Sequence, residues 1–220
     1  MNLFSVVIIL MILGFVVAGV SALRSGRGEG RCRRILRIAA VFFLVYGALA
    51  FFVQALCASG GLSFLRSSFE WPLATVSGVV RDSVGDYIAP HPPSGRVQVY
   101  DRDKRFLLGW TVDAGGGVFK LSVTDDDSIE VFTARGNRHY VFTLAGDLVS
   151  QSTYGQQSYS DLGRSAETTE NFQTPIFLLP FSHPFAGWTL GALGMVGLIV
   201  LDKTKKGKRH RTTVSNATSG

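Results

Sequence analysis

Four histidines are the residues of this sequence best suited to catalysis or metal binding, because imidazole can act as a general base and as a metal ligand near neutral pH. They are His91, His139, His183 and His210, and no two of them have the spacing of a metal-binding pair. The sequence also has no glycine-rich phosphate loop and no Gly-x-Ser-x-Gly nucleophile motif. We therefore expect a protein that is not an enzyme, with no catalytic residue, cofactor or bound metal.

Three consecutive carboxylates, Asp125, Asp126 and Asp127, are the strongest candidate for cation binding. Calcium prefers hard oxygen ligands of this kind. An acidic run between two predicted strands is also typical of a solvent-exposed turn. We favour the turn, and the sequence leaves open whether calcium binds there.

Four glycines are spaced for helix packing. Gly187, Gly191, Gly194 and Gly197 follow one another at intervals of four, three and three residues, which places them near one face of a helix. Small residues at this spacing allow a second helix to approach closely. They are the candidate site residues of the sequence, and the partner is expected to be a membrane protein, a second copy of the chain, or the first or second apolar segment of the same chain.

Three long apolar stretches contain the four glycines or flank the segment with the acidic run. A helix needs about 20 residues to cross a hydrocarbon core, and residues 1–23, 38–58 and 185–201 meet or approach that length. A cleaved signal peptide is the alternative for the first stretch, since Val20-Ser21-Ala22 offers small residues for cleavage. That stretch lacks a basic segment before its apolar run, so we expect a membrane helix instead.

The basic charge lies in two short segments. The net charge is +6, and residues 24–37 and 202–220 each contain six Lys or Arg against one acidic residue. Short basic loops stay on the cytoplasmic side, so we expect a cytoplasmic loop at 24–37, a cytoplasmic tail at 202–220, and an N-terminus outside the plasma (cytoplasmic) membrane. Arg24 to Arg37 and Lys203 to Arg211 are expected to contact anionic lipid headgroups. No nucleic acid is expected as a partner.

Residues 59–150 are expected to form a β domain outside the membrane, because apolar and polar residues alternate there with the period of half-buried strands. The segment Pro90–Gly95 is expected to interrupt the strands, since its three prolines cannot donate hydrogen bonds. A polar tether is expected at 151–184, leading back to the third span. The expected strands lie at residues 76–80, 97–99, 106–112, 118–123, 129–134 and 139–144.

The tryptophans and cysteines add three expectations. Trp71 and Trp188 lie near the outer ends of predicted spans, where indole rings favour the membrane surface. Trp110 falls in a predicted strand and is expected in the core. Cys32 and Cys57 lie on opposite sides of the membrane in this topology, so no disulfide is expected within the chain.

The β segment resembles the carboxypeptidase regulatory-like domain. Gly78, Val80, Asp82 and Gly85 match the family's opening motif G-x-V-x-D-x-x-G, and the segment from Thr111 to Val123 is similar to its second hairpin. The resemblance implies a small, non-catalytic β-sandwich of transthyretin-like topology. The expected fold is therefore three transmembrane α-helices plus an extracytoplasmic antiparallel β-sandwich of about seven strands.

The expected function is that of a membrane-anchored, non-catalytic binding or structural protein that presents this β-sandwich outside the membrane. The alternative is an accessory subunit of a larger membrane protein complex, docked through the glycines of the third span. The sequence does not identify a ligand or an oligomeric state.

Overall fold

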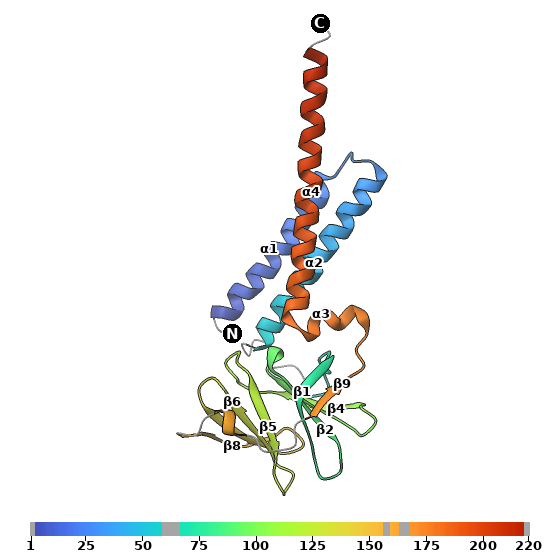
Figure 1. The fold of residues 1–220 in the computed structure, drawn as a ribbon. Helices are drawn as coiled ribbons and strands as arrows, with labels where there is room; N and C mark the ends of the chain where they lie inside the picture. Colours follow the sequence, from blue (N-terminus) through green and yellow to red (C-terminus); the bar gives the residue numbers. More distant parts are fainter. Residues whose placement is uncertain (1–2, 59–66, 156–158, 163–167, 218–220) are drawn as a thin grey trace.

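A bundle of long helices carries a β domain at one end, and the C-terminus lies at the other end (Figure 1). The computed structural model describes residues 3–58, 67–155, 159–162 and 168–217, without the side chains of residues 161 and 205–217. Within these ranges, three helices are long and apolar enough to cross a membrane, at Leu3–Ser25, Arg31–Ala58 and Pro184–Thr204. These spans indicate a multi-pass membrane protein.

The helices extend further than the apolar runs alone predict. α1 (Leu3–Ser25) and α2 (Arg31–Ala58) are joined by only a short turn, and α4 (Pro184–Ala217) runs on through the basic tail. The loop expected at 24–37 is therefore shorter than predicted. Arginine is a good helix former, so the basic residues from Arg31 onwards lengthen α2 by about two turns beyond its apolar run.

The β domain consists of two antiparallel sheets. Sheet 1 has five strands in the order β4-β3-β2-β1-β9, and sheet 2 has four in the order β5-β6-β7-β8. The described residues thus form nine strands, where about seven were expected. The strands are β1 (Thr75–Arg81), β2 (Tyr87–His91), β3 (Arg96–Tyr100), β4 (Phe106–Thr111), β5 (Phe119–Val123), β6 (Ile129–Thr133), β7 (Arg138–Phe142), β8 (Leu148–Thr153) and β9 (Thr168–Asn171).

Three strands were not predicted: β2 runs into the expected turn, β8 runs into the expected tether, and β9 lies inside that tether. Pro90 is inside β2 and pairs with Val97 of β3. The pairing of β1 with β2 covers only Val80↔Ile88 and Arg81↔Tyr87. Pro90 lies beyond these pairs, so the N–H that proline lacks is not needed to bond a carbonyl of β1. The predicted tether contains β9, whose polar residues complete the edge of sheet 1 beside β1.

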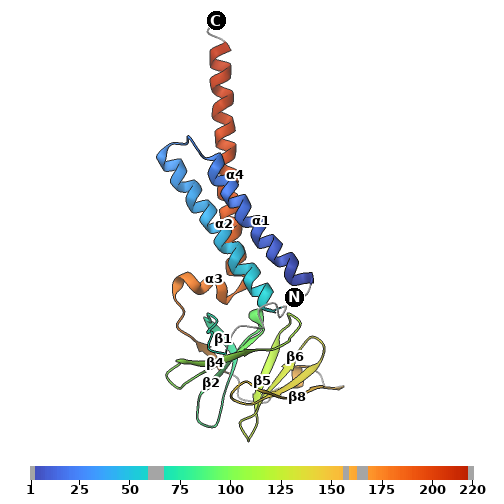
Figure 2. The ribbon, with the colours of Figure 1, turned by 180° about the vertical axis from the view of Figure 1, so that it is seen from behind.

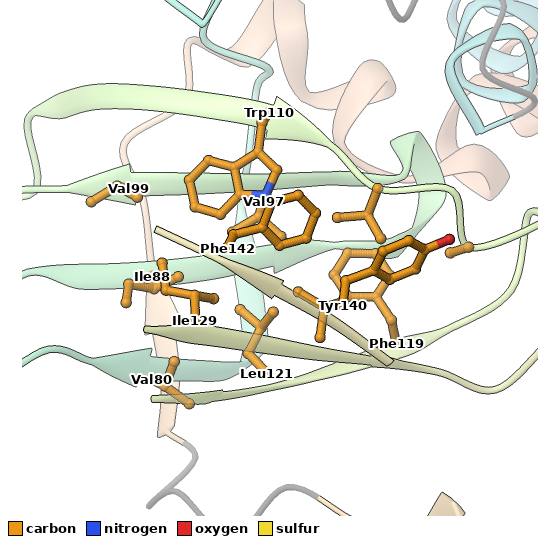
Figure 3. Packing of buried hydrophobic residues seen from close by; sticks show 13 residues of the cluster. Val80, Ile88, Val97, Val99, Trp110, Phe119, Leu121, Ile129, Tyr140 and Phe142 are labelled. Atoms are coloured by element: carbon orange, nitrogen blue, oxygen red, sulfur yellow. The ribbon is translucent and has the colours of Figure 1, made fainter. Parts of the chain in front are cut away.

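The two sheets share one apolar core. Figure 3 shows side chains of β1 to β4 meeting those of β5 to β7, with Trp110 and Phe142 in contact across the gap between the sheets. The fully buried members include Val97, Leu121 and Ile129. Alternation along each strand supplies this core, because every second side chain faces the same side of a sheet.

Sheet 1 is buried on its second face as well. Residues Arg96, Gln98 and Tyr100 of β3 alternate with the core residues and are also buried. They lie on the face that is covered by Phe172 and by the segment before β1. Leu73 of that segment, Phe172 and Tyr100 belong to a second apolar cluster. This second face is where the β domain meets the helices.

Candidate functional site

The four glycines predicted for helix packing lie on the side of α4 that faces α2. A Cβ added at Gly194 would come within 2.3 Å of the Leu44 backbone nitrogen, and one at Gly187 within 2.9 Å of the Phe51 nitrogen. A Cβ at Gly197 would meet the Ala40 side chain at 3.2 Å. The two helix backbones are therefore in direct contact, and the helix beside these glycines is the second span of the same chain.

Gly47 of α2 completes this contact and was not among the candidate residues. A Cβ on Gly47 would lie 2.2 Å from the Gly191 nitrogen. The available signal was the set of small residues Ala40, Gly47 and Ala50, which recur at helical spacing along α2. The surface that the sequence offered to a partner protein or a second copy is thus occupied by α2.

A second contact joins the β domain to the helices through one short helical turn, α3 (Leu179–Ser182). The last carbonyls of a helix have no partner inside the helix, and Pro184, which follows, has no N–H to offer. Three side chains bond these carbonyls instead. The bonds run from Gln54 Nε2 to the Pro180 oxygen (3.2 Å), from Trp71 Nε1 to the Phe181 oxygen (3.0 Å) and from His91 Nε2 to the Ser182 oxygen (2.9 Å).

We call these three donors and three acceptors the carbonyl clamp. Its donors come from α2, from the segment before β1, and from β2, so one turn of α3 holds three separate parts of the chain together. Gln54, Trp71 and His91 are 1%, 3% and 4% exposed. A buried polar group that loses its partner destabilises the fold by about 1–3 kcal/mol, so the clamp favours one orientation of the β domain on the helices.

Gln98 fastens Trp71 to sheet 1. Its side-chain oxygen accepts from the Trp71 backbone N–H at 2.5 Å, and its side-chain nitrogen donates to the Trp71 carbonyl at 3.0 Å. The same nitrogen donates to the Tyr100 hydroxyl. The buried Gln98 amide thus makes the two hydrogen bonds to the Trp71 backbone that a paired strand would make. It thereby fixes the position of the indole that bonds α3.

His91 is held in one neutral form. Its Nε2 faces the Ser182 carbonyl and must carry the proton, so Nδ1 accepts from the Ser94 hydroxyl at 2.7 Å. Burial lowers the pKa of His91 to about 4. The bond to the Ser182 carbonyl opposes this lowering of the pKa, and the nearby His183 and Arg96 add to it. The buried His91 is therefore neutral in the carbonyl clamp near pH 7.

Acidification is expected to lower the free energy of unfolding of the chain with its β domain docked. Unfolded His91 takes up a proton near pH 6.5, whereas folded His91 stays neutral down to about pH 4. The unfolded state thus binds more protons in this interval, and the free energy of unfolding falls by about 1.4 kcal/mol per pH unit, or about 3 kcal/mol in all. Denaturant titrations of the full chain in detergent at pH 7, 5.5 and 4.5 measure it.

The matched control for this effect is His91→Gln, whose amide can still donate to Ser182 but does not titrate. Its stability should lack this component of the pH dependence. Equal pH dependence in the variant and the original chain would contradict the assignment.

The opposite end of the helices contains a buried ion network. Arg37 is 1% exposed and pairs with Glu29 at 2.7 Å and with Asp202 at 2.8 Å. Arg33 also pairs with Glu29, and it donates to Thr204 at 2.9 Å. The arginine segment and the start of the basic tail therefore lie at one end of the bundle, away from the β domain (Figure 2).

Among the side chains that the structure describes, the other candidates from the sequence do not converge. In the described part of the chain no three His, Cys, Asp or Glu side chains are grouped to hold a metal. Asp126 accepts from the Thr124 and Ser128 hydroxyls, which lower its pKa, and Asp127 accepts from the Ser83 N–H at 2.9 Å. The acidic turn is thus bonded to its own surroundings.

The tryptophans have three different environments. Trp110 is in the core between the sheets, as expected. Trp188 is 59% exposed on the surface of α4. Trp71, expected at the membrane surface, is instead buried in the carbonyl clamp, because Gln98 and Phe181 bond its two N–H groups and its carbonyl.

The fold and the clamp define a multi-pass membrane protein with a β domain docked on one end of its helices. No protein-family model matches the chain, and no curated protein is similar to it in sequence.

Proposed function

We propose that the chain is a membrane-anchored, non-catalytic binding or structural protein that presents its β domain outside the cytoplasmic membrane. The observation that carries this proposal is the carbonyl clamp, which fixes the β domain to the end of the spans. A domain on a polar tether alone would be free to rotate. A domain held by three buried hydrogen bonds offers its loops and edges to a partner in a constant orientation.

The distribution of charge supports the proposed topology. The arginine segment and the basic tail lie at the end of the bundle remote from the β domain, and short basic segments remain in the cytoplasm. Ile176 and Phe177, in the short helical turn η3 (Ile176–Leu178) just before α3, are 82% and 65% exposed. Their position next to the start of α4 suits burial in the outer surface of the bilayer.

The turn residues support the proposed relation to carboxypeptidase regulatory-like domains. Gly78 and Gly85 of the opening motif have φ angles of +80° and +89°, which glycine adopts without strain. Asp82 accepts from the Asp86 N–H at 2.8 Å and closes the turn between β1 and β2. Gly78 lies at the register shift of β1 opposite β9, whereas Asp82 and Gly85 shape the turn after β1. These roles in backbone geometry suit a module that binds rather than one that catalyses.

An accessory subunit of a larger membrane complex is the second candidate. A cavity of about 440 Å³ opens between α1 and α4 over α2, lined by Phe15, Phe52, Trp188 and Met195 among others. Gly187 and Gly191 also line this cavity, so a membrane helix of another protein would find there an apolar surface that adjoins the contact of α4 with α2.

Site-specific photo-cross-linking in native membranes tests the proposal. We expect a discrete cross-linked product from a probe at Val149, which is 62% exposed on β8, an edge strand of sheet 2. A probe at Met195, 46% exposed in the cavity between α1 and α4, is the matched position inside the membrane. Protein products from Met195 alone would favour the accessory subunit, and no product from either position would contradict a binding role.

A further inference from the structure

An apolar groove runs between α1 and α2 towards their connecting turn. It encloses about 340 Å³ and is lined by side chains of both helices, among them Val16, Val41, Phe42 and Leu49. These residues belong to the two candidate spans. An apolar groove along two membrane spans is exposed to the acyl chains of lipids.

A second cavity, of about 350 Å³, continues the groove at the turn between the helices. Arg24, Arg27 and Arg34 line it together with Glu29. Val20 and Leu23 line both cavities. The two hollows therefore form one elongated site that is apolar along the helices and basic at its end.

The arginines of this segment divide into two groups. Arg33 and Arg37 are paired with Glu29, whose side chain is only 4% exposed. Arg24, Arg27 and Arg34 are exposed and have no carboxylate partner among the residues that the structure describes. Since the charge of Glu29 is already balanced, the basic cavity keeps a net positive charge.

We propose that this site binds one anionic phospholipid, with its phosphate among Arg24, Arg27 and Arg34 and an acyl chain in the groove between α1 and α2. Guanidinium groups suit phosphate oxygens because they present several N–H donors in one plane. Basic cavities between spans at the cytoplasmic side recognise lipid headgroups by this chemistry. A free phosphate would leave the apolar groove empty, so the bound species is the lipid.

Native mass spectrometry of the full chain in detergent tests the site, with phosphatidylglycerol and phosphatidylcholine as probes. We expect retained phosphatidylglycerol and little phosphatidylcholine. The triple variant R24Q/R27Q/R34Q should lower the affinity for phosphatidylglycerol at least about tenfold, since each basic residue near an anionic headgroup strengthens the attraction to it. The variant K203Q/K205Q/K206Q removes the same charge from the tail and should leave the affinity unchanged.

Two further experiments distinguish binding of the whole lipid from binding of its headgroup alone. Val20→Trp should fill the wall shared by the two cavities and lower phosphatidylglycerol binding while all arginines remain. Glycerol 3-phosphate, the headgroup chemistry without acyl chains, should not compete at equal concentration. Unaltered binding in either the arginine variant or Val20→Trp, equal loss in the tail variant, equal retention of phosphatidylcholine, or competition by glycerol 3-phosphate would each overturn the proposal. Unchanged circular dichroism shows that the variants remain folded.

Discussion

Replacing Gly194 with alanine should push α4 away from α2, while the same change at Gly191 should have little effect. The added Cβ at Gly194 would lie 2.3 Å from the Leu44 nitrogen, which is backbone and cannot move aside, whereas at Gly191 its nearest neighbour would be 3.6 Å away. Overpacking of this kind destabilises by about 1–3 kcal/mol. Thermal unfolding in detergent, followed by circular dichroism, measures the difference between the two variants.

The sign of the two effects makes the comparison informative. Alanine is the better helix former by about 1 kcal/mol, so without helix contact both changes would be neutral or stabilising. A lower melting temperature for Gly194→Ala together with an unchanged or higher one for Gly191→Ala is the expected pattern. Equal shifts in the two variants would show that the close approach of α2 and α4 is absent in solution.

Arg37→Met is expected to destabilise the helix bundle by about 3 kcal/mol, because it leaves the buried carboxylate of Glu29 without its closest partner. Methionine keeps much of the length and apolar character of the arginine stem, so the change reports mainly on charge. Denaturant titration in detergent measures the loss.

Two companions test the assignment of this loss. Arg34→Met removes an exposed charge from the same turn of α2 and should change stability little. Adding Glu29→Gln to Arg37→Met should restore much of the stability, since the orphaned charge is then removed. A double variant no more stable than Arg37→Met would refute the ion network as the cause.

Local sequence pattern was sufficient for most of the secondary structure. The uncharged runs predicted the three spans, and alternation predicted the six strands β1 and β3 to β7. β2 was missed because Pro90 counts against a strand, although it lies beyond the pairing of β2 with β1. β8 and β9 were missed because most of their residues are polar, and the place of β9 in sheet 1 depends on pairing with β1 across the whole domain.

The candidate site was predictable only in part. The glycine spacing in α4 depends on one helix and is visible in the sequence, but the identity of the facing helix depends on tertiary packing. The carbonyl clamp has no local pattern at all. Gln54, Trp71 and His91 are far apart in the chain, and each meets a carbonyl of α3 only after the helices and the β domain have folded.

The position of the clamp also determines how the chain would carry mechanical load. α4 begins two residues after the last clamped carbonyl and continues without interruption for 34 residues, or about 50 Å. Asp202, near the far side of the spans, ties the same helix to Arg37 of α2. A pull on the β domain would therefore be transmitted along α4. α2 would share this load through Gln54 at one end and Arg37 at the other, and the turn between α1 and α2 would be displaced.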